Sequence, residues 1–322
     1  MNSSLIKTVG PLVVPVVLGP TAVGKTGIAL RLARDLDREI ISCDSRQIYR
    51  YMNIATAKPS PDQLSGVKHW LVDCCDPSEH YSAYAFSRDA LRILMQSNGR
   101  AIICGGTGYY FKCLVEGIAP ATPTQMHFRR EYEKKVHAGG TYSIFNELKA
   151  VDPESAGKIH PHDIRRIIRA LEVYYFSGRK RSDLPKESQP PEHLHFCVIK
   201  VSLPRCTLYD RINSRVDQMF ENGLWHEFTS LIKRGYSSES AGMQCVGYKE
   251  FFEVLNNNIT LESALEQIKR NTRRYAKRQI SWFKHQVEGT EFDLSTCTYA
   301  DILAQVKNAI ESGRNDTRRL LA

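Results

Sequence analysis

The stretch GPTAVGKT has the residue types and the spacing of a phosphate-binding loop. It fits the pattern G-x-x-x-x-G-K-[ST] and lies between an apolar, strand-like run and a helical pattern, the context in which this motif binds phosphate. The glycines let backbone N–H groups surround phosphate oxygens, while Lys25 supplies a positive charge and the Thr26 hydroxyl can hold Mg²⁺. The sequence therefore predicts a phosphate cradle made of Gly19, Pro20, Thr21, Ala22, Val23, Gly24, Lys25 and Thr26. The motif alone does not tell which phosphate compound binds.

A second stretch, AIICGGTGYY, lacks the acid that is expected in a P-loop ATPase. The apolar run from Ala101 to Cys104 has the length and the flanking glycines of a buried parallel strand. In Walker-type ATPases an Asp on a second strand binds the magnesium ion. Here the strand is followed by Gly105, Gly106 and Thr107. The chain thus combines a phosphate cradle with small, hydrogen-bonding groups where a nucleotidase keeps a carboxylate.

The segment SCDSRQIY adds a carboxylate near the predicted cradle. Asp44 follows a short apolar strand at 39–43, so we expect it at the carboxyl edge of the sheet. Ligands of open α/β sheets bind at that edge, which makes Asp44 a candidate general base or metal ligand. An Asp that only caps a helix or closes a turn would give the same pattern. The neighbouring phosphate cradle favours the functional interpretation.

Strand and helix patterns alternate around these motifs, which predicts the fold class. Strand-like runs at 12–18, 39–43 and 101–104 alternate with helical patterns at 28–36 and 83–97. We expect an α/β fold, namely a P-loop parallel sheet flanked by helices, with a helical insertion domain. The composition changes at PATPTQ and again after a polar stretch, RKRSDLPKESQPPEH. The predicted domains are 1–120 with 195–322 for the sheet and the C-terminal helices, and 121–194 for the helical insertion.

The composition favours a reduced, intracellular enzyme with a polyanionic partner. Lys and Arg number 44 against 35 Asp and Glu, a net charge of +9 that suits nucleic acid but could also serve only solubility. The nine cysteines form no Cys-x-x-Cys motif, which excludes the common zinc patterns. No apolar run is long enough for a membrane span, and Met1 to Gly10 lacks the features of a signal or transit peptide. We therefore expect a cytoplasmic protein without a membrane partner.

Two helical segments carry clusters of positive charge. In DIRRIIRALEVYYFSG, the residues at core spacing are Ile164, Ile167, Ile168, Leu171 and Tyr174 or Tyr175, and those on another face are Arg165, Arg166 and Arg169. In QIKRNTRRYAKRQISWFKH, the predicted apolar stripe is Ile268, Tyr275, Ala276, Ile280 and Phe283, and the basic residues are Lys269, Arg270, Arg273, Arg274, Lys277 and Arg278. Such surfaces bind the phosphates of nucleic acids, although a merely solvated basic face gives the same pattern.

As a set, the motifs GPTAVGKT, ISCDSRQIYRYMNIATAKP, CGGTGYYFKCLVEG, HPHDIRRIIRALEV, MQCVGYKE and TRRYAKRQISWFK resemble the tRNA dimethylallyltransferases, the isopentenyl-tRNA transferases of bacteria. The matching segments run in family order from Val16 to Phe283. The resemblance implies transfer of a dimethylallyl group from dimethylallyl diphosphate to N6 of adenosine 37 of tRNA, with release of diphosphate. In that reaction the cradle holds a diphosphate leaving group and nothing is hydrolysed, which accounts for the missing Walker acid.

The resemblance also implies roles for individual residues. Asp44 matches the family's general base, which is needed because the exocyclic amine of adenine is a poor nucleophile. Thr107 matches the Thr of a GGTG motif and would contact the diphosphate bridge or the target nucleotide. Lys25, the cradle amides, Mg²⁺ on Thr26 and an arginine would stabilise the departing diphosphate. For that arginine the candidates are Arg211 and Arg215, with Arg215 preferred.

The tRNA contacts implied by the resemblance extend over much of the chain. They are Asp44, Ser45, Arg46, Gln47, Thr107, Arg129, Arg165, Arg166, Ile167, Ile168, Arg169, Gln244, Cys245, Val246, Gly247, Tyr248, Lys249, Arg273, Lys277 and Arg278. Because the target base is stacked in folded tRNA, it must be extruded into a pocket that the DSRQ segment would line. The chain departs from the family pattern at Trp70 and at Ala55, where many members have His and Gly, so the shape of the donor pocket is in question.

Two other classes of protein share the phosphate cradle. A small-molecule P-loop kinase would need an acid close to the GGTG strand and would have no use for the basic helices. A P-loop ATPase or nucleic-acid-binding module would use Asp44 as a magnesium ligand. Release of diphosphate from an allylic donor without consumption of ATP separates both from the transferase. Nothing in the sequence suggests an assembly larger than a monomer.

Overall fold

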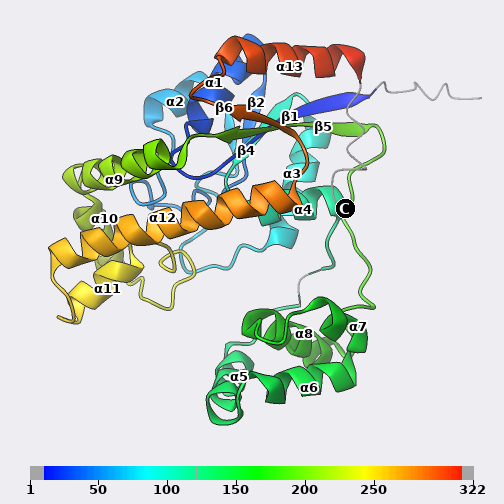
Figure 1. Ribbon diagram of the computed structural model, residues 1–322, viewed down its shortest axis with the longest axis vertical. Helices are drawn as coiled ribbons and strands as arrows, with labels where there is room; N and C mark the ends of the chain where they lie inside the picture. Colours follow the sequence, from blue (N-terminus) through cyan, green and yellow to red (C-terminus); the bar gives the residue numbers. More distant parts are fainter. Residues whose placement is uncertain (1–10, 121, 314–322) are drawn as a thin grey trace, which may run out of the picture. The chain divides into compact units, whose positions relative to one another are not determined.

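The computed structural model describes residues 11–120 and 122–313, which form two compact units. The first unit comprises Met1–Glu116 and Pro190–Ala322, and the second comprises Gly117–Gln189. The predicted insertion, 121–194, overlaps the second unit over most of its length. Residues 1–10, 121 and 314–322 of the predicted domains lie outside the described residues. Figure 1 shows the elements of each unit.

The first unit contains a six-stranded sheet in the order β3-β2-β4-β1-β5-β6, in which neighbouring strands run parallel. The strands are β1 (Leu12–Leu18), β2 (Glu39–Ser42), β3 (His69–Trp70), β4 (Ala101–Gly105), β5 (Leu194–Ser202) and β6 (Thr290–Asp293). The predicted α/β fold with a parallel sheet is confirmed. The runs at 12–18 and 101–104 are apolar throughout because strands buried on both faces have no polar side.

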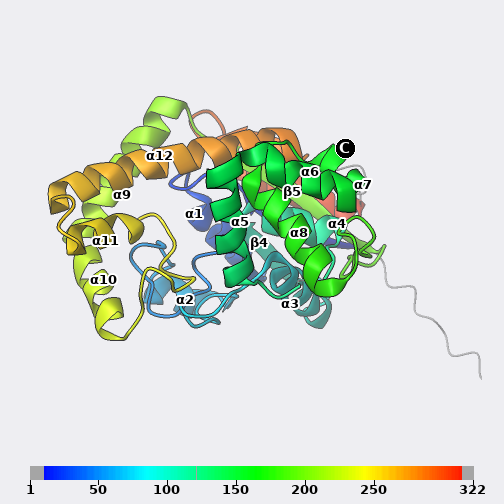
Figure 2. The same ribbon diagram turned by 90° about the horizontal axis from the view of Figure 1, so that it is seen from below.

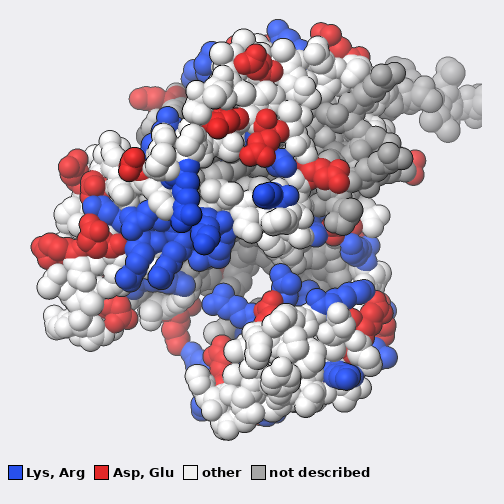
Figure 3. Space-filling view, viewed as in Figure 1, with Lys and Arg blue, Asp and Glu red and all other residues white. Residues whose placement is uncertain are grey.

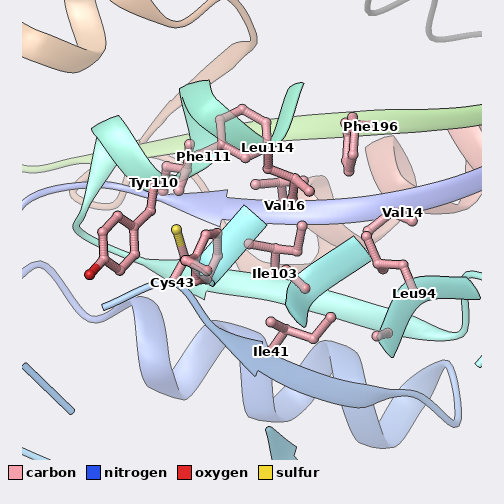
Figure 4. Close-up of a cluster of buried hydrophobic side chains, with 14 of the residues drawn as sticks. Val14, Val16, Ile41, Cys43, Leu94, Ile103, Tyr110, Phe111, Leu114 and Phe196 are labelled. Atoms are coloured by element: carbon pink, nitrogen blue, oxygen red, sulfur yellow. The ribbon is translucent and has the colours of Figure 1, made fainter. Parts of the chain in front are cut away.

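Helices cover both faces of this sheet. The described helices of the first unit are α1 (Lys25–Asp35), α2 (Pro61–Gly66), α3 (Ala83–Gln96), α4 (Gly108–Glu116), α9 (Arg205–Glu221), α10 (Leu224–Lys233), α11 (Lys249–Leu255), α12 (Leu261–Gln286) and α13 (Tyr299–Ser312), of which α10 and α11 pack on α9 and α12 rather than on the sheet. On one face Val14 and Val16 pack with Phe111 and Phe196, as Figure 4 shows. On the other face Val17 packs with Leu32 of α1. Alternate side chains of one strand thus build two cores.

The strand register brings three loops to the same edge of the sheet. Leu18 of β1 lies opposite Gly105 of β4, and Ser42 of β2 lies opposite Cys104. The chain therefore leaves β1 into the phosphate cradle, β2 toward Asp44, and β4 toward Thr107, all at one edge. A side chain at Gly105 would place a Cβ only 2.0 Å from the carbonyl oxygen of Cys43, so only glycine allows these two strands to end so close together.

Helix α12 packs on α4, α9 and α11 (Figures 1 and 2). Its buried stripe includes Ile268, Ala276 and Phe283, as predicted. The prediction was wrong for Tyr275 and Ile280, which are 36% and 39% exposed. The stripe follows a narrow track along the helix and leaves those two positions on its flanks. At the turn between Ala276 and Phe283 the buried position belongs to a polar residue, Gln279, which a search for apolar periodicity passes over.

The second unit is a bundle of four helices, α5 (Met126–Gly139), α6 (Thr141–Val151), α7 (Pro153–Lys158) and α8 (Ile164–Ser177). Its core includes Phe128, Leu148 and Leu171. Ile167 and Ile168 are buried in the same core, with 0% and 4% exposure. Their helical spacing predicted a core face, and their burial means that their side chains do not reach the surface, although the motif that contains them resembles a tRNA-binding segment.

Among the described residues, no helix has both the length and the apolar character that crossing a membrane requires.

Candidate active site

The predicted phosphate cradle connects β1 to α1. Ala22 and Gly24 have φ angles of 64° and 108°, in the left-handed region, which curls the backbone ahead of the helix. Helix α1 begins at Lys25, and its N-cap residue, Gly24, makes no side-chain cap hydrogen bond. The first N–H groups of α1 and the positive end of its dipole are thus available for an anion. Within the cradle, Lys25 Nζ donates a hydrogen bond to the carbonyl oxygen of Pro20 at 2.6 Å.

Lys25, Asp44 and Arg215 lie within electrostatic reach of one another. Burial lowers the pKa of Lys25 to about 8; Arg215 also lowers it, whereas Cys104 and Asp44 act in the opposite direction. Burial likewise lowers the pKa of Arg215, and the carboxylate of Asp44 opposes this shift. The three groups were predicted from separate motifs of the sequence. The structure brings them together at the carboxyl edge of the sheet.

The carboxylate of Asp44 is held in place by its own loop. Its Oδ1 accepts hydrogen bonds from the backbone N–H groups of Arg46, at 2.8 Å, and Gln47, at 3.4 Å. The turn that was the structural alternative for Asp44 is therefore present. It leaves Oδ2 without a hydrogen bond to the residues that the structure describes. A fixed carboxylate with one oxygen open is suited to accept a proton from a substrate.

Thr107 is bound to the same loop. Its Oγ1 accepts a hydrogen bond from the backbone N–H of Ser45 at 3.0 Å, and its own N–H donates to the carbonyl oxygen of Cys43 at 3.1 Å. The loops that follow β2 and β4 are thus joined directly. A hydroxyl and a carboxylate are in this way fixed beside the cradle.

The Tyr275 hydroxyl also reaches this place, although its ring is partly exposed. Burial, and next the negative charge of Asp44, raise the pKa of Tyr275 to about 12, while Arg46 and a hydrogen bond with Thr107 act in the opposite direction. Sequence reasoning assigned Tyr275 to an apolar core. Tyr275 is instead partly exposed and interacts with Asp44 and Thr107.

A cavity lies beside the cradle. Its lining is mainly apolar and consists of Thr21, Ala22, Ala55, Thr56, Ala57, Ile212, Arg215, Val216, Met219, Leu224, Val246, Gly247, Ile268 and Thr272. Arg215 is the only charged residue of this set, and Arg211, one turn earlier on α9, is exposed. Of the two candidate arginines, the structure places Arg215 in the cavity. Ala55, a departure from the family pattern, lies in its wall.

Gln279 of α12 is a residue of the site that sequence reasoning missed. Its side chain is only 6% exposed. Its Oε1 accepts a hydrogen bond from the backbone N–H of Thr21 at 2.9 Å, and its Nε2 donates to the carbonyl oxygen of Gly106 at 2.9 Å. One amide thus connects the cradle to the loop that carries Thr107. The sequence did contain a signal for it, because Gln279 is a polar residue at the helical spacing of the buried residues Ala276 and Phe283.

Comparison with known proteins places this arrangement in a family. The family described as IPP transferase matches residues 47–286. This chain belongs to the IPP transferase family. The predicted family and the predicted class of enzyme, a transferase, are therefore confirmed.

Relatives and solved structures of the family match the chain over most of its length. A tRNA dimethylallyltransferase of Thermotoga maritima is 40% identical over 300 residues, 92% of this chain and 97% of that protein. One from a Thermoanaerobacter species is 42% identical over 282 residues, 83% of this chain and 87% of that protein. The crystal structure of a tRNA isopentenylpyrophosphate transferase from Bacillus halodurans matches with a TM-score of 0.67 and 37% identity, covering 94% of this chain and 96% of that one. A eukaryotic dimethylallyltransferase acting on tRNA has a TM-score of 0.74 and 28% identity, with coverage of 95% and 81%.

In this member of the family, α12 carries a cluster of positive charge. Arg270, Arg274, Lys277 and Arg278 have exposed side chains, and Figure 3 shows Lys and Arg side chains gathered over this helix. Arg273, predicted to contact tRNA, is partly buried and its Nη1 donates a hydrogen bond to Asn213 Oδ1 at 2.5 Å. The predicted contacts Lys277 and Arg278 are thus more open to a ligand than Arg273 is.

On the second unit, Arg165 and Arg166 are exposed, whereas Arg129 and Arg169 are held by a buried carboxylate. Glu172, with 0% exposure, accepts hydrogen bonds from Arg129 Nε at 3.0 Å and Nη2 at 2.8 Å, and also from Arg169. Burial by itself would raise the pKa of Glu172, but the hydrogen bonds from Arg129, from the backbone of Gln125 and from Arg169 lower it. Arg129 and Arg169 are therefore fixed in orientation rather than solvated freely.

Two further residues predicted to contact tRNA, Gln47 and Arg46, make hydrogen bonds within the protein. Gln47 Oε1 accepts a hydrogen bond from Ser42 Oγ at 3.0 Å, and its Nε2 donates to the carbonyl oxygen of Ala57 at 3.1 Å. Arg46 Nη1 donates to the carbonyl oxygen of Ala241 at 3.1 Å.

The predicted tRNA-binding segment 244–249 follows closely after Ala241, the hydrogen-bond partner of Arg46. Its residues Cys245, Gly247 and Tyr248 are buried, and only Gln244 and Lys249 have exposed side chains.

Proposed function

We propose that this protein transfers a dimethylallyl group from dimethylallyl diphosphate to N6 of adenosine 37 of tRNA, and releases diphosphate. The observation that carries the proposal is the meeting of a phosphate cradle, the Asp44 carboxylate and the Thr107 hydroxyl at one edge of the sheet. An anion site beside a base and a hydroxyl suits transfer of a group from a diphosphate to a weakly nucleophilic amine. The names of the relatives agree with this reaction.

The cradle binds the diphosphate of the donor, and the cavity binds its dimethylallyl group. The N–H groups at the start of α1 hold the diphosphate together with Lys25, and Arg215 approaches it from the cavity. The apolar part of the cavity, including Val216, Met219 and Leu224, takes the five-carbon chain. As the C–O bond to diphosphate breaks, negative charge grows on the leaving group, and these positive groups stabilise it most in the transition state.

Asp44 acts on the acceptor. The amine of adenosine is a poor nucleophile because its lone pair is delocalised into the purine ring. As N6 forms its bond to C1 of the dimethylallyl group, one proton passes from N6 to the Asp44 carboxylate, and diphosphate leaves with the electron pair of the broken C–O bond. Thr107, held by Ser45, is placed to donate a hydrogen bond to the diphosphate or to orient the nucleotide.

The residues present fit a magnesium ion that binds together with the donor. Mg²⁺ prefers oxygen ligands and keeps several waters, with substrate phosphates and one or two protein groups completing its shell. The described residues contain no group of three His, Cys, Asp or Glu side chains that could hold a metal ion by themselves, so its ligands from the protein would be few. Thr26, at the start of α1, offers the hydroxyl. When bound, Mg²⁺ would neutralise charge on the departing diphosphate.

The basic surfaces bind the tRNA backbone. Arg274, Lys277 and Arg278 on α12, and Arg165 and Arg166 on the second unit, contact phosphates, which positions the nucleic acid without reading its sequence. The target nucleotide is turned out of its stack to reach Asp44. We propose that the protein works as a monomer in the cytoplasm.

The test is incubation of the purified protein with Mg²⁺, dimethylallyl diphosphate and unmodified tRNA, followed by digestion and mass spectrometry. We expect a dimethylallyl-adenosine that is absent when the adenosine at position 37 is replaced by guanosine. The same samples are assayed with ATP in place of the donor. Hydrolysis of ATP or transfer of its γ-phosphate, without any prenylated nucleoside, would refute the proposal in favour of an ATPase or a kinase.

A further inference from the structure

One face of α12 is fitted to the loop that follows β4. Tyr275, Gln279 and Trp282 are spaced by one helical turn each, so they lie on the same side of the helix. Tyr275 interacts with Thr107, and Gln279 donates its hydrogen bond to Gly106. Trp282 packs where a side chain of Gly108 would lie.

The close packing of α12 explains why residues 106 and 108 of this loop are glycines. A Cβ on Gly106 would lie 2.4 Å from Nε2 of Gln279, and a Cβ on Gly108 would lie 2.3 Å from Cδ1 of Trp282. A larger residue at Gly106 would displace the amide of Gln279, and one at Gly108 would displace the ring of Trp282. The loop and the helix thus pack closely against each other around Thr107.

Gln279 extends this packing to the phosphate cradle. Its Oε1 accepts the N–H of Thr21, a residue 258 positions away in the chain, at 2.9 Å. The hydrogen bond to Gly106 is buried and the one to Thr21 is partly buried, so loss of the amide would leave the Gly106 carbonyl oxygen without its partner inside the protein. The cradle, the Thr107 loop and α12 therefore share one connecting group.

The basic surface of the same helix lies beside this face. Arg274, Lys277 and Arg278 flank the Tyr275–Gln279–Trp282 face and are exposed. An RNA phosphate bound there would restrain α12, and the two hydrogen bonds of Gln279 connect α12 to the cradle and to the loop. A second ligand that binds to an already ordered site loses less conformational entropy and binds more tightly.

We propose that Gln279 is a positioning residue that couples RNA binding on α12 to diphosphate binding in the cradle. The coupling is reciprocal, so that bound RNA tightens the diphosphate site and bound diphosphate tightens RNA binding by the same factor. The inference rests on the proposed function for the identity of the two ligands. It requires no chemical turnover.

The test measures the affinity of inorganic diphosphate with Mg²⁺, by calorimetry, in the absence and in the presence of saturating tRNA. For the unaltered protein we expect binding to be at least about fivefold tighter with tRNA. Gln279→Met keeps the length and burial of the side chain but cannot make either hydrogen bond. We expect it to bring the ratio of the two affinities close to one, while the affinity for tRNA alone stays unchanged.

Gln286→Met is the matched control, because Gln286 belongs to the same helix and also makes a side-chain hydrogen bond, to Lys112 Nζ at 2.8 Å. It should keep the ratio of the unaltered protein. Should Gln279→Met fail to fold, Gln279→Glu serves instead, since it keeps the acceptor for Thr21 and loses only the donor to Gly106; it should lower the ratio too. A ratio of one in the unaltered protein, an unchanged ratio in both Gln279 variants, or equal loss in the control would overturn the coupling.

The prenylation assay separates this inference from the function on which it rests. If the unaltered protein forms dimethylallyl-adenosine and Gln279→Met keeps the coupling, the inference fails and the function stands. If no prenylated nucleoside forms, the function fails irrespective of the binding data.

Discussion

Ser45 donates its backbone N–H to the hydroxyl of Thr107 at 3.0 Å, and this bond joins the loop of Asp44 to the loop that follows β4. The two loops leave neighbouring parallel strands, β2 and β4, whose ends are in register. The carboxylate of Asp44 and the hydroxyl of Thr107 consequently form one fixed unit beside the phosphate cradle. Their geometry does not have to be assembled when substrates bind, which lowers the entropic cost of the reaction.

We expect Asp44→Asn to lose the transfer reaction and to keep tRNA binding. The amide oxygen of Asn can still accept the N–H groups of Arg46 and Gln47, so the turn is kept while the basic oxygen is lost. Loss of a general base typically costs about 10²- to 10⁴-fold in rate. Single-turnover kinetics and a tRNA-binding titration measure the two effects separately. A loss of tRNA affinity as large as the loss of rate would contradict the assignment of Asp44 as the base.

We expect Arg215→Ala to weaken use of the donor far more than Arg211→Ala does. Arg215 lines the cavity and acts on the pKa of Lys25, whereas Arg211 is exposed. Removing one group that stabilises a developing anion costs about a hundredfold or more in rate. The measurement is kcat/KM for dimethylallyl diphosphate at saturating tRNA. Similar values of kcat/KM for the two variants would show that Arg215 has no special role in use of the donor.

We expect diphosphate binding by the free protein to weaken as the pH rises through about 8. Burial lowers the pKa of Lys25 to about 8, so the ammonium is present below this pH and is lost above it. For each further pH unit, the fraction of Lys25 in the charged form falls by up to about tenfold. Affinity is measured from pH 7 to pH 9.5, with Lys25→Met as the control that should bind more weakly and show no such decline. An equal decline in the control would assign the pH dependence to the ligand.

We expect Lys277→Ala combined with Arg278→Ala to reduce the salt dependence of tRNA binding. Both side chains are exposed on the basic surface of α12. Each phosphate contact contributes about 0.7 to 0.9 to the slope of log K against log salt concentration, so the double variant should lose about 1.5. Lys307→Ala, an exposed lysine of α13, is the control and should leave the slope unchanged. An unaltered slope in the double variant would indicate a solvated face.

The sequence by itself determined the features that depend on close neighbours in the chain. The phosphate cradle was predicted because its conformation follows from glycines at fixed spacing between a strand and a helix, and β1 spans the predicted residues, 12–18. The parallel sheet was predicted because apolar runs alternate with amphipathic helices. The set of motifs identified the family. The catalytic and tRNA-binding roles of the individual residues stay predictions.

Tertiary structure alone decided which distant side chains complete the site. Arg211 and Arg215 are equivalent on a helix of unknown orientation, and only the packing of α9 directs Arg215 into the cavity. Gln279 meets Thr21 across 258 residues of chain, a contact that no local pattern encodes. Periodicity sorts side chains by hydrophobicity and cannot identify the hydrogen-bond partner of a buried polar group, because that partner is supplied by whichever element packs against it.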